Sequence, residues 1–318
     1  MTNAYSDHNP PTGEPSPAGR FAPSPSGQLH VGNLRTAVLS WLFAHTTGRR
    51  YLLRMENLDR SAVGADAGQI ADLRALGITW EPPVIYQTDR LPHYREVIDG
   101  LAAAGRTFEC YCTRREILEA PSAPHTPPGA YPGTCRELTA AQRAAKRDSG
   151  RPPAIRIIAD TTEFTVTDVL AGQYTGAVDD FVIQRGDGTP AYNLAVVVDD
   201  AEQGIDQVCR GDDLLSSAPR QAYLATLLGH QPPTYAHVPM VLNADGIRLS
   251  KRDGAVTLAD LAGIGVNAAT VLDHIAASLG LAAPGEHITL DDMAARFDAD
   301  ALPREPWVLT GAEWGARP

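Results

Sequence analysis

Two segments far apart in the sequence carry residues suited to binding phosphate groups. The first is RFAPSPSGQLHVGN, residues 20–33, in which Gly27, His30, Gly32 and Asn33 directly precede an apolar run with helical spacing. Glycines let the backbone approach a ligand closely, and the N–H groups at a helix start attract phosphate. His30 would add a directional donor. A loop that only caps the helix is the alternative, and this segment alone does not decide between the two.

The second segment is GIRLSKRDGA, residues 246–255, which places Ser250, Lys251 and Arg252 between glycines. A mobile loop with two cations could close on a triphosphate and stabilise the charge that develops at its α-phosphate. A solvated basic loop is the alternative. Taken together, the two segments favour an ATP site in which His30 and Lys251 act on the phosphates.

The four cysteines are divided unequally along the chain. Cys110, Cys112 and Cys135 lie close together, whereas Cys209 stands apart. With no secretory signal a disulfide framework is not expected, so the division predicts a metal cluster and one buried thiol. Two buried thiols with a stray third are the alternative. Zinc prefers four tetrahedral ligands, and His125 in the same segment is a chemically suitable fourth.

The elements that would position these residues alternate between strands and helices. The segments 19–24 and 50–57 are predicted as strands. Gly48, Gly77 and Gly105 are plausible helix stops. The predicted helices are residues 33–48, 66–77 and 91–105. This alternation is typical of a parallel α/β domain.

The composition of the sequence changes four times along the chain and suggests four regions, one of them in two segments. Residues 1–18 are rich in Pro, Ser and Gly and are predicted to be a disordered lead-in. Residues 110–153 are proline-dense and are predicted to be an insertion held by something other than a core. Residues 19–109 and 154–240 form the α/β domain, with a helix at 214–229. A hairpin signal and short helices follow in 241–318.

The formal net charge of −11 argues against a general nucleic-acid binder. A nucleic-acid partner would need a local basic surface, so the charge does not exclude a tRNA enzyme. No apolar run approaches the roughly 20 residues of a membrane helix, and the N-terminus lacks the apolar core of a secretory signal. The sequence therefore predicts a cytoplasmic protein with no membrane contact.

Both phosphate segments resemble known motifs. HVGN resembles the HIGH motif of class I aminoacyl-tRNA synthetases, and RLSKR, about 220 residues later, resembles their KMSKS motif. The segments RFAPSPSGQLHVGNLRTA, AYNLAVVVDD and VCRGDDLLSSAPRQ resemble the glutamyl branch in particular. The resemblance extends from Arg20 to Ala255. It implies a Rossmann-type catalytic domain that joins an amino acid to ATP, with Mg²⁺ accompanying the nucleotide.

The resemblance also implies a set of residues around a bound glutamate. Arg20 and Arg210 are predicted to hold its carboxylates, Glu56 its ammonium, and Tyr192 to add a hydroxyl and a wall. The implied glutamate-binding set is Arg20, Phe21, Ala22, Pro23, Ser24, Glu56, Tyr192 and Arg210. The implied ATP-binding set is Gly27, His30, Gly32, Asn33, Ser250 and Lys251.

The sequence departs from the family pattern in two motifs. Where many relatives carry R-I-E-D-T-D this chain has RMENLD, so that Asn57 replaces an acid while Glu56 and Asp59 are kept. The motif that resembles KMSKS ends in Arg252. We expect Glu56 to keep its role, and the role of Asn57 is open.

The chain also departs from the family pattern in its length. Only 66 residues follow Arg252, whereas full glutamyl-tRNA synthetases carry an anticodon-binding domain there. The chain therefore resembles the shortened branch of the family, which activates glutamate without tRNA and transfers it to the queuosine base in the anticodon of tRNA(Asp). That branch is expected to act as a monomer on the anticodon arm. Its zinc pattern implies Cys110, Cys112, Tyr131 and Cys135 as ligands of one structural zinc ion, with Tyr131 favoured over His125.

Two other functions remain open at the level of sequence. One is an ordinary glutamyl-tRNA synthetase cut short, which the cysteine pattern and the short C-terminal region argue against. The other is a non-catalytic protein, similar to a synthetase, that binds glutamate or tRNA. The presence of His30 and Lys251 argues against it.

Overall fold

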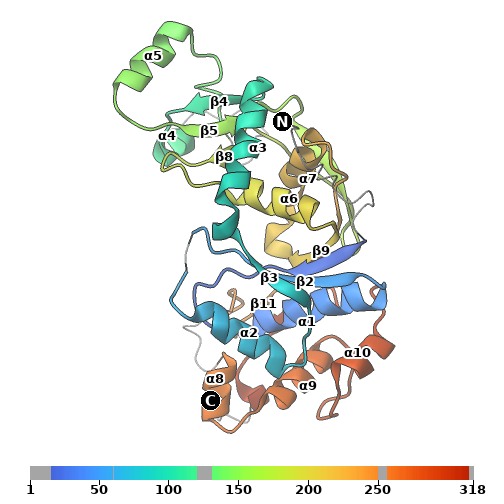
Figure 1. Cartoon of the computed structure of the whole chain (residues 1–318). Helices are drawn as coiled ribbons and strands as arrows, with labels where there is room; N and C mark the ends of the chain where they lie inside the picture. The colour runs from blue at the N-terminus through green and yellow to red at the C-terminus, as the bar shows by residue number, and fades with distance from the viewer. Residues whose placement is uncertain (1–15, 60, 120–130, 250–255, 315–318) are drawn as a thin grey trace, which may run out of the picture.

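A seven-stranded sheet forms the centre of the protein (Figure 1). The computed structural model describes residues 16–59, 61–119, 131–249 and 256–314. Neighbouring strands pair in parallel except for the last two, which form an antiparallel hairpin. In spatial order the strands are β3 (Glu81–Tyr86), β2 (Arg50–Met55), β1 (Ala18–Phe21), β9 (Ile205–Gly211), β10 (Thr234–Val238), β6 (Glu163–Asp168) and β7 (Gly172–Ala177).

Strand β1 marks the point where the direction of chain winding reverses. It pairs with β2 on one side and with β9 on the other, so that Ala18 is the partner of both Arg50 and Ile205. Helix α1 (Val31–Thr46) connects β1 to β2, and α2 (Ala65–Ala75) connects β2 to β3. In open α/β sheets ligands bind in the crevice outside the carboxyl ends of the strands at such a reversal. The fold therefore places a binding crevice where β1 and β9 end.

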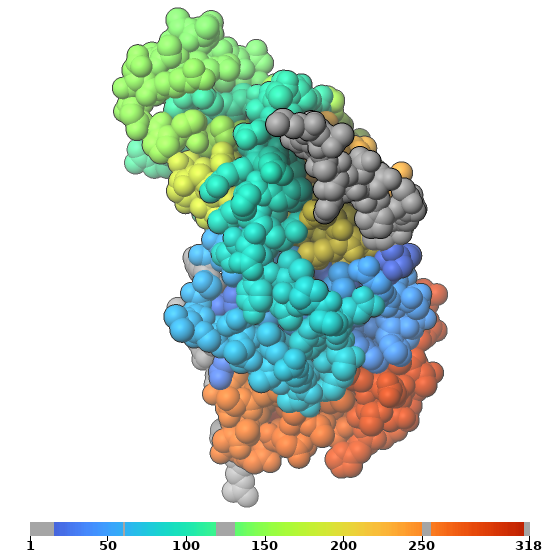
Figure 2. Space-filling model, viewed as in Figure 1, coloured from blue at the N-terminus to red at the C-terminus, as the bar shows by residue number. Residues whose placement is uncertain are grey.

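Helix α1 lies between two layers and is apolar nearly all around. Leu34, Ala37, Val38 and Leu42 are fully buried, which is the pattern of a helix covered on more than one side. One side packs on the sheet. The C-terminal helices cover the other, as Figure 2 shows where the orange and red segments press against the blue ones. These helices are α8 (Leu258–Gly263), α9 (Ala268–Ser278) and α10 (Leu290–Arg296).

A second sheet lies apart from the first, at the far end of the molecule (Figure 1). Its three antiparallel strands are β4 (Thr107–Cys110), β5 (Ala154–Ile157) and β8 (Val182–Gln184). The sheet joins both ends of the proline-dense insertion, which carries α4 (Arg114–Glu119) and α5 (Ala140–Asp148). Strands β5 and β8 fall inside the range 154–240 predicted for the catalytic domain, yet they pair with β4 and not with the central sheet.

Three helices connect the two sheets around a core of their own. They are α3 (Leu91–Ala103), α6 (Tyr192–Glu202) and α7 (Ala218–Leu227), and their core includes Tyr94, Leu194 and Leu224. The short helices η1 (Gln87–Arg90) and η2 (Asp212–Ser217) precede α3 and α7. Near the C-terminus β11 (Val241–Leu242) pairs with β12 (Trp307–Val308), and η3 (Ala312–Trp314) follows.

Most predicted elements are present close to their expected positions. The helix predicted for 33–48 spans Val31–Thr46, and Gly48, Gly77 and Gly105 all have positive φ just after helices. The hairpin signal is also confirmed, because Leu242 bridges antiparallel to Arg248. Strand β1 begins at Ala18, the last residue of the predicted lead-in. Among the described residues, no helix combines the length and the apolar character needed to cross a bilayer.

Candidate functional site

A cavity of about 480 Å³ opens at the carboxyl ends of β1 and β9. Its walls come from the end of β1, the loop that follows, the start of α1, and the end of β9. All of the predicted glutamate- and ATP-binding residues that the structure describes line it. They are Arg20, Phe21, Ala22, Pro23, Ser24, Gly27, His30, Gly32, Asn33, Glu56, Tyr192 and Arg210. Two predicted residues, Ser250 and Lys251, lie outside the described residues, as does Arg252.

His30 caps helix α1 and is thereby fixed in one tautomer. Its Nδ1 accepts a hydrogen bond from the Asn33 N–H at 3.2 Å, while the Asn33 Oδ1 accepts from the His30 N–H at 3.2 Å. This is a capping box built with an imidazole in place of the usual hydroxyl. Because Nδ1 acts as acceptor, the proton of the neutral ring sits on Nε2. His30 thus carries an N–H donor at the start of a helix, a position that suits phosphate oxygens.

Gly32 leaves the space that this imidazole needs. A Cβ at Gly32 would come within 3.0 Å of the His30 ring and 3.2 Å of the Val241 Cβ. The start of α1 is also fixed from the C-terminal region, because the Val31 N–H donates to the Val256 carbonyl at 2.8 Å. These contacts hold the start of α1, the His30 imidazole and the segment that begins at Val256 in fixed positions relative to one another.

The loop between β1 and α1 is braced by Gln69, a residue that no sequence motif singles out. Its Nε2 donates to the carbonyls of Ser24 at 3.1 Å and Gly27 at 2.7 Å. Gln69 is buried on α2, where its polarity is unexpected on the inner face of a helix. Gly27 itself has φ 148°, a conformation that favours glycine. The one sequence signal that could have identified Gln69 is a glutamine at a helix position where an apolar residue is expected.

Arg20 reaches the cavity from the end of β1 and is held by a carboxylate. Its Nε and Nη2 donate to the two oxygens of Asp200 at 3.1 and 3.3 Å. Burial favours a raised pKa for the Asp200 carboxyl, but Arg20 and Arg54 outweigh it and lower that pKa, so the carboxylate stays ionised. The bidentate contact fixes the plane of the guanidinium and leaves its other N–H groups for a ligand.

Arg54 is a second residue missed from the sequence, and it is fully buried on β2. A buried charge is stable only when it is paired, and Arg54 lies among three carboxylates. Its Nη1 lies 2.8 Å from Asp200 Oδ1, its Nη2 3.2 Å from Glu56 Oε1, and its Nε 3.5 Å from Asp199 Oδ2. Arg54 therefore connects the carboxylate that orients Arg20 to the one predicted to bind an ammonium group.

Glu56 contributes a negative charge to the cavity beside Arg20. Burial raises the pKa of its carboxyl, while Arg54 and Arg20 oppose that shift. Among the described residues only Arg54 bonds to this carboxylate, through Oε1. Oε2 is therefore the natural partner for a cationic ligand group.

Asp199 and Asp200 share Arg54 but otherwise have different partners. The sequence alone allows either a structural or a substrate-orienting role for each of them. Asp199 is fully buried and accepts from Gln87 at 2.9 Å, from Arg90 at 2.6 Å and from Tyr94 at 2.9 Å. It anchors α6 to η1 and α3, whereas Asp200 faces Arg20.

Arg210 enters the cavity from the end of β9, the strand that pairs with β1. Its Nη1 donates to Gln221 Oε1 at 2.7 Å and its Nε to His237 Nε2 at 3.0 Å. Tyr192 begins α6, lines the same cavity and is 37% exposed. Two further charged residues of the lining, Arg248 and Asp213, pair with each other at 2.7 Å. Arg20, Arg210 and Glu56 remain, a charge pattern complementary to an amino acid with two carboxylates.

Asn57, the residue that replaces an acid, makes a structural contact with Thr88 through both atoms of its amide. Its Nδ2 donates to the Thr88 hydroxyl at 2.8 Å, and its Oδ1 accepts from the Thr88 N–H at 3.0 Å. The pair fastens the loop after β2 to η1. A carboxylate could accept from the N–H but could not donate.

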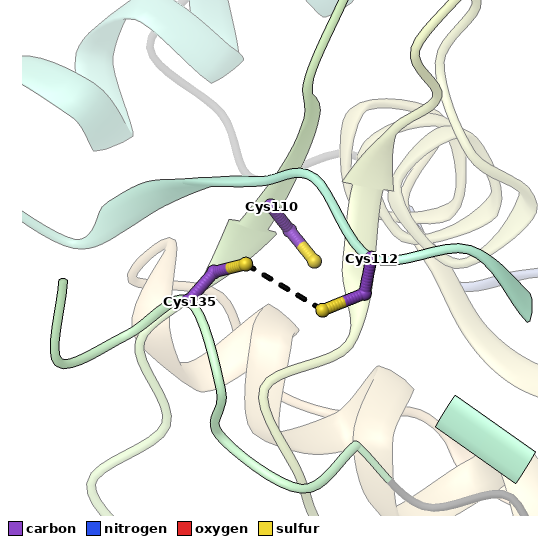
Figure 3. A group of neighbouring side chains, drawn as sticks. All are labelled: Cys110, Cys112 and Cys135. Carbon is purple, nitrogen blue, oxygen red and sulfur yellow. Dashed lines mark hydrogen bonds between the residues drawn. The ribbon is translucent and has the colours of Figure 1, made fainter. Parts of the chain in front are cut away.

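The sulfurs of Cys110, Cys112 and Cys135 point toward one another at the end of β4 (Figure 3). All three lie within 4.8 Å of one another, and Cys112 Sγ is 3.5 Å from Cys135 Sγ. Zinc–sulfur bonds of about 2.3 Å in a tetrahedron place sulfurs about 3.8 Å apart. The three thiols therefore have the spacing of a zinc site, and they lie in the proline-dense segment where a metal could replace a core.

Tyr131 brings its phenol to the same cluster. The Cys135 N–H donates to the Tyr131 oxygen at 2.7 Å, and that oxygen is close to the Cys110 and Cys135 thiols. The Arg156 guanidinium lies 3.8 Å above the Tyr131 ring. An oxygen that accepts from an N–H beside three sulfurs is suited to be a fourth ligand. The alternative, His125, lies outside the described residues.

Comparison with known proteins matches this arrangement. Residues 18–311 match the sequence profile of the family described as tRNA synthetases class I (E and Q), catalytic domain. The chain is 60% identical over 293 residues to the Glutamyl-Q tRNA(Asp) synthetase of Nocardia farcinica, covering 92% of this chain and 93% of that protein. It is 39% identical over 295 residues to a Glutamate--tRNA ligase of Synechococcus sp., covering 90% of this chain but 62% of that protein.

Solved structures with a similar fold include a glutamate-tRNA synthetase. A glutamate-tRNA synthetase structure from Elizabethkingia anophelis superposes with a TM-score of 0.80 at 23% identity, covering 95% of this chain and 69% of that one. At this identity the comparison supports the fold alone. The extent of the profile match and the identity to curated relatives show that this chain is a member of the class I tRNA synthetases of the glutamyl and glutaminyl type.

Proposed function

We propose that this protein activates L-glutamate with ATP and transfers it to the queuosine base in the anticodon of tRNA(Asp). The observation that carries the proposal is the cavity at the β1–β9 reversal, with Arg20, Arg210 and Glu56 around it. The relative named Glutamyl-Q tRNA(Asp) synthetase is matched over 93% of its length, whereas the Glutamate--tRNA ligase is matched over 62%. The first match supports the shortened branch of the family as the closer functional guide.

The charged side chains around the cavity are complementary to the charged groups of glutamate. Arg20, oriented by Asp200, and Arg210, oriented by Gln221 and His237, would each take one carboxylate through paired N–H donors. Glu56 Oε2 would accept from the ammonium group. Tyr192 would close the open side of the cavity. Two arginines in one cavity favour an amino acid with a second carboxylate.

Adenylation needs no general base in this scheme, because the attacking glutamate carboxylate is already ionised. The carboxylate oxygen would attack the α-phosphorus of ATP, and pyrophosphate would leave. His30 Nε2–H and the N–H groups at the start of α1 would stabilise charge on the phosphate oxygens. We expect Ser250 and Lys251 to assist through their hydroxyl and ammonium groups. Mg²⁺ bound to ATP would neutralise part of the phosphate charge.

Transfer to tRNA needs a basic surface on an acidic protein. Residues 107–153 contain seven Lys and Arg against five Asp and Glu, although the whole chain has a net charge of −11. Helix α5 buries none of its residues, carries Arg143, Lys146 and Arg147, and projects from the body of the molecule (Figure 1). This helix is suited to contact phosphates of the anticodon arm. A queuosine hydroxyl would then attack the adenylate carbonyl and release AMP. We place this reaction in the cytoplasm and expect a monomer.

We further propose that Cys110, Cys112, Cys135 and Tyr131 hold one structural zinc ion. Burial raises the pKa of the Cys112 thiol to about 12, and a bound cation would reverse that shift. Elemental analysis of the purified protein should find one zinc per chain, and Cys135→Ser should lose it. Retention of one zinc in that variant would exclude this ligand set. Tyr131→Phe, which keeps the ring, would test the fourth ligand by metal affinity.

The test of the main proposal is glutamate-dependent exchange between ATP and pyrophosphate, run with and without tRNA. Exchange with glutamate alone, absent with glutamine and aspartate, is the expected result. Glutamate should then be transferred to tRNA(Asp) that contains queuosine, and not to tRNA that lacks it. Exchange that requires tRNA(Glu) would instead indicate a shortened ordinary synthetase. Absence of exchange under every condition would leave a non-catalytic binding protein.

A further inference from the structure

Three buried polar residues on neighbouring strands lead from the sheet interior to the cavity. Asp168 ends β6, His237 lies on β10, and Arg210 lies on β9, where it is the direct register partner of His237. The His237 Nδ1 is 2.6 Å from Asp168 Oδ2, and the Arg210 Nε is 3.0 Å from His237 Nε2. Of the three, only Arg210 lines the cavity. Asp168 and His237 could therefore affect a ligand only through Arg210.

These contacts fix the tautomer of His237. The Nε of an arginine carries a hydrogen and can only donate, so His237 Nε2 must be the acceptor. The ring proton then lies on Nδ1 and is donated to Asp168. Burial lowers the pKa of His237, and Arg210 lowers it further while Asp168 opposes the shift. The ring is therefore neutral, with its single proton on Nδ1.

The contacts of Asp168 favour the ionised form of its carboxyl group. Its Oδ1 accepts from the N–H groups of Leu170 and Ala171, each at 2.8 Å, and its Oδ2 accepts from the His237 N–H at 3.0 Å. Burial acts to raise the pKa of this carboxyl, but the contact with His237 and these N–H groups outweigh burial and lower it. Asp168 thus offers only acceptors to the imidazole.

The guanidinium of Arg210 is held at three points. Nε is bonded to His237, Nη1 to Gln221 Oε1 at 2.7 Å, and Nη2 lies 3.4 Å from the Leu214 carbonyl. An arginine has five N–H donors, so two remain, one on each terminal nitrogen. The Tyr235 ring lies 5.3 Å from the guanidinium carbon and restricts it further. The orientation of the two remaining donors is therefore set by protein contacts before any ligand binds.

We propose that His237, held as its Nδ1–H tautomer by Asp168, is a positioning residue that sets the guanidinium plane of Arg210 for a substrate carboxylate. This role rests on the proposed function, because it assigns Arg210 to one carboxylate of the amino acid. His237 contacts no substrate and takes part in no proton transfer. Its effect is on amino-acid affinity, because a rigid guanidinium loses less freedom when the carboxylate binds.

Asp168→Asn tests this tautomer because it replaces one carboxylate oxygen by an NH2 group and hardly changes the volume. It also removes the acceptor of the His237 backbone N–H, so the His237 variants are measured beside it. The asparagine amide can donate to His237 Nδ1, which would move the ring proton to Nε2. Two donors, His237 Nε2–H and Arg210 Nε–H, would then face each other. We expect the KM for glutamate to rise at least tenfold, with the KM for ATP changed less than twofold. His237→Leu should have the same effect, and His237→Gln, which keeps an acceptor, should restore part of the affinity.

Asp273→Asn is the matched control, since Asp273 also accepts from a histidine, His287, at 2.7 Å but lies on α9 away from the cavity. It should leave both KM values unchanged. If all four variants have the same glutamate KM as the unmodified protein, or if the KM for ATP rises equally, the positioning role is wrong. Urea denaturation of each variant shows whether a loss reflects unfolding.

Two measurements keep this inference separate from the proposed function. Nitrogen-15 chemical shifts of histidine should show His237 protonated at Nδ1 in the unmodified protein and at Nε2 in Asp168→Asn. Protonation at Nε2 in the unmodified protein overturns the inference whatever the enzyme does. Calorimetric titration with glutamate reports affinity without catalysis. Absence of exchange combined with tight, Asp168-dependent binding would reject the catalytic proposal and retain the positioning role, whereas absence of binding rejects both.

Discussion

The Cα of Gly32 lies directly beside the imidazole of His30, so that a Cβ there would come within 3.0 Å of two ring atoms. The ring belongs to the capping box of α1 and is not a flexible end that can swing away. On the far side Val241 closes the space at 3.2 Å. The glycine of the HVGN segment is thus required for the position of the histidine.

Gly32→Ala should therefore reduce ATP use more than it reduces stability. The displaced imidazole would misplace its Nε2–H, and we expect kcat/KM for ATP to fall 10- to 100-fold, about 1.4–2.7 kcal/mol of transition-state stabilisation. Gly68→Ala is the control, because Gly68 lies inside α2 and a Cβ added there would meet no atom within 4 Å. That change should leave activity intact and stabilise the helix by about 0.5–1 kcal/mol. Equal activity losses in both variants would contradict this account.

Arg54→Met should destabilise the protein strongly. It leaves Glu56, Asp199 and Asp200 without their shared buried cation, and breaking a buried pair costs about 3–5 kcal/mol. Arg50→Met on the same strand removes a partly exposed pair with Glu81, worth about 0–1 kcal/mol, and a 3.4 Å hydrogen bond to the Gln203 carbonyl. The free energy of unfolding in urea measures both. A loss below about 1 kcal/mol for Arg54→Met would show that the network tolerates an unpaired carboxylate cluster.

Gln69→Leu should weaken the binding of both substrates. The leucine fits the buried position but cannot donate to the Ser24 and Gly27 carbonyls, which would lose their brace. We expect both KM values to rise about threefold to tenfold in the exchange assay, the size of about one hydrogen bond. Ala71→Gln, on the exposed side of the same helix, should change neither. Unchanged KM values for Gln69→Leu would show that the loop holds its shape by itself.

Reversal of charge on α5 should affect transfer and leave activation unchanged. In the double variant Arg143→Glu and Lys146→Glu we expect glutamate-dependent exchange within twofold of normal. The KM for tRNA should rise at least tenfold at 0.1 M salt, and its salt dependence should become shallower. Arg95→Glu reverses one exposed charge on α3, outside the insertion, and should have little effect. Equal tRNA KM values in all proteins would place the docking surface elsewhere.

The affinity for glutamate should depend on pH through Glu56. The ammonium group binds the carboxylate form, and burial raises the pKa of Glu56 above its ordinary value. Affinity should therefore be full above that raised pKa and should fall as pH decreases through it, at a pH above the usual range of a glutamic acid. Glu56→Gln should bind weakly at every pH and lose this dependence. Calorimetric titration between pH 5 and pH 8 tests both; an identical pH profile in the variant would assign the effect to another group.

The residues predicted to bind glutamate and ATP line one cavity, and several of them could be found from the sequence because they are close together in short motifs. His30, Gly32 and Asn33 lie within four positions and form one cap, and glycines with positive φ end the helices at the expected places. The residues that orient this cavity were not predicted. Arg54 acts on Asp199 and Asp200 from a strand almost 150 residues earlier, and such pairing depends on strand order, which no short pattern encodes.

Two elements show how packing overrides local preference. Strand β3 contains Pro82 and Pro83, which argue against a strand, but it lies at the sheet edge where a missing N–H is tolerated. The residues Val196–Val198 favour a strand by their branched side chains, yet they lie inside α6. Their burial between α3 and α7 gives more stability than the helix propensity loses.

The pairing of β1 with β9 joins residues separated by almost 190 positions, since Ala18 meets Ile205 and Gly19 meets Gln207. A ribosome adding roughly 5–20 residues per second needs about 10–40 s to make that intervening chain. During that interval one edge of β1 lacks its partner and half of the cavity wall does not exist. Contacts between such distant positions also slow folding because the loop must close before they form. Substrate binding is therefore among the last properties that the growing chain acquires.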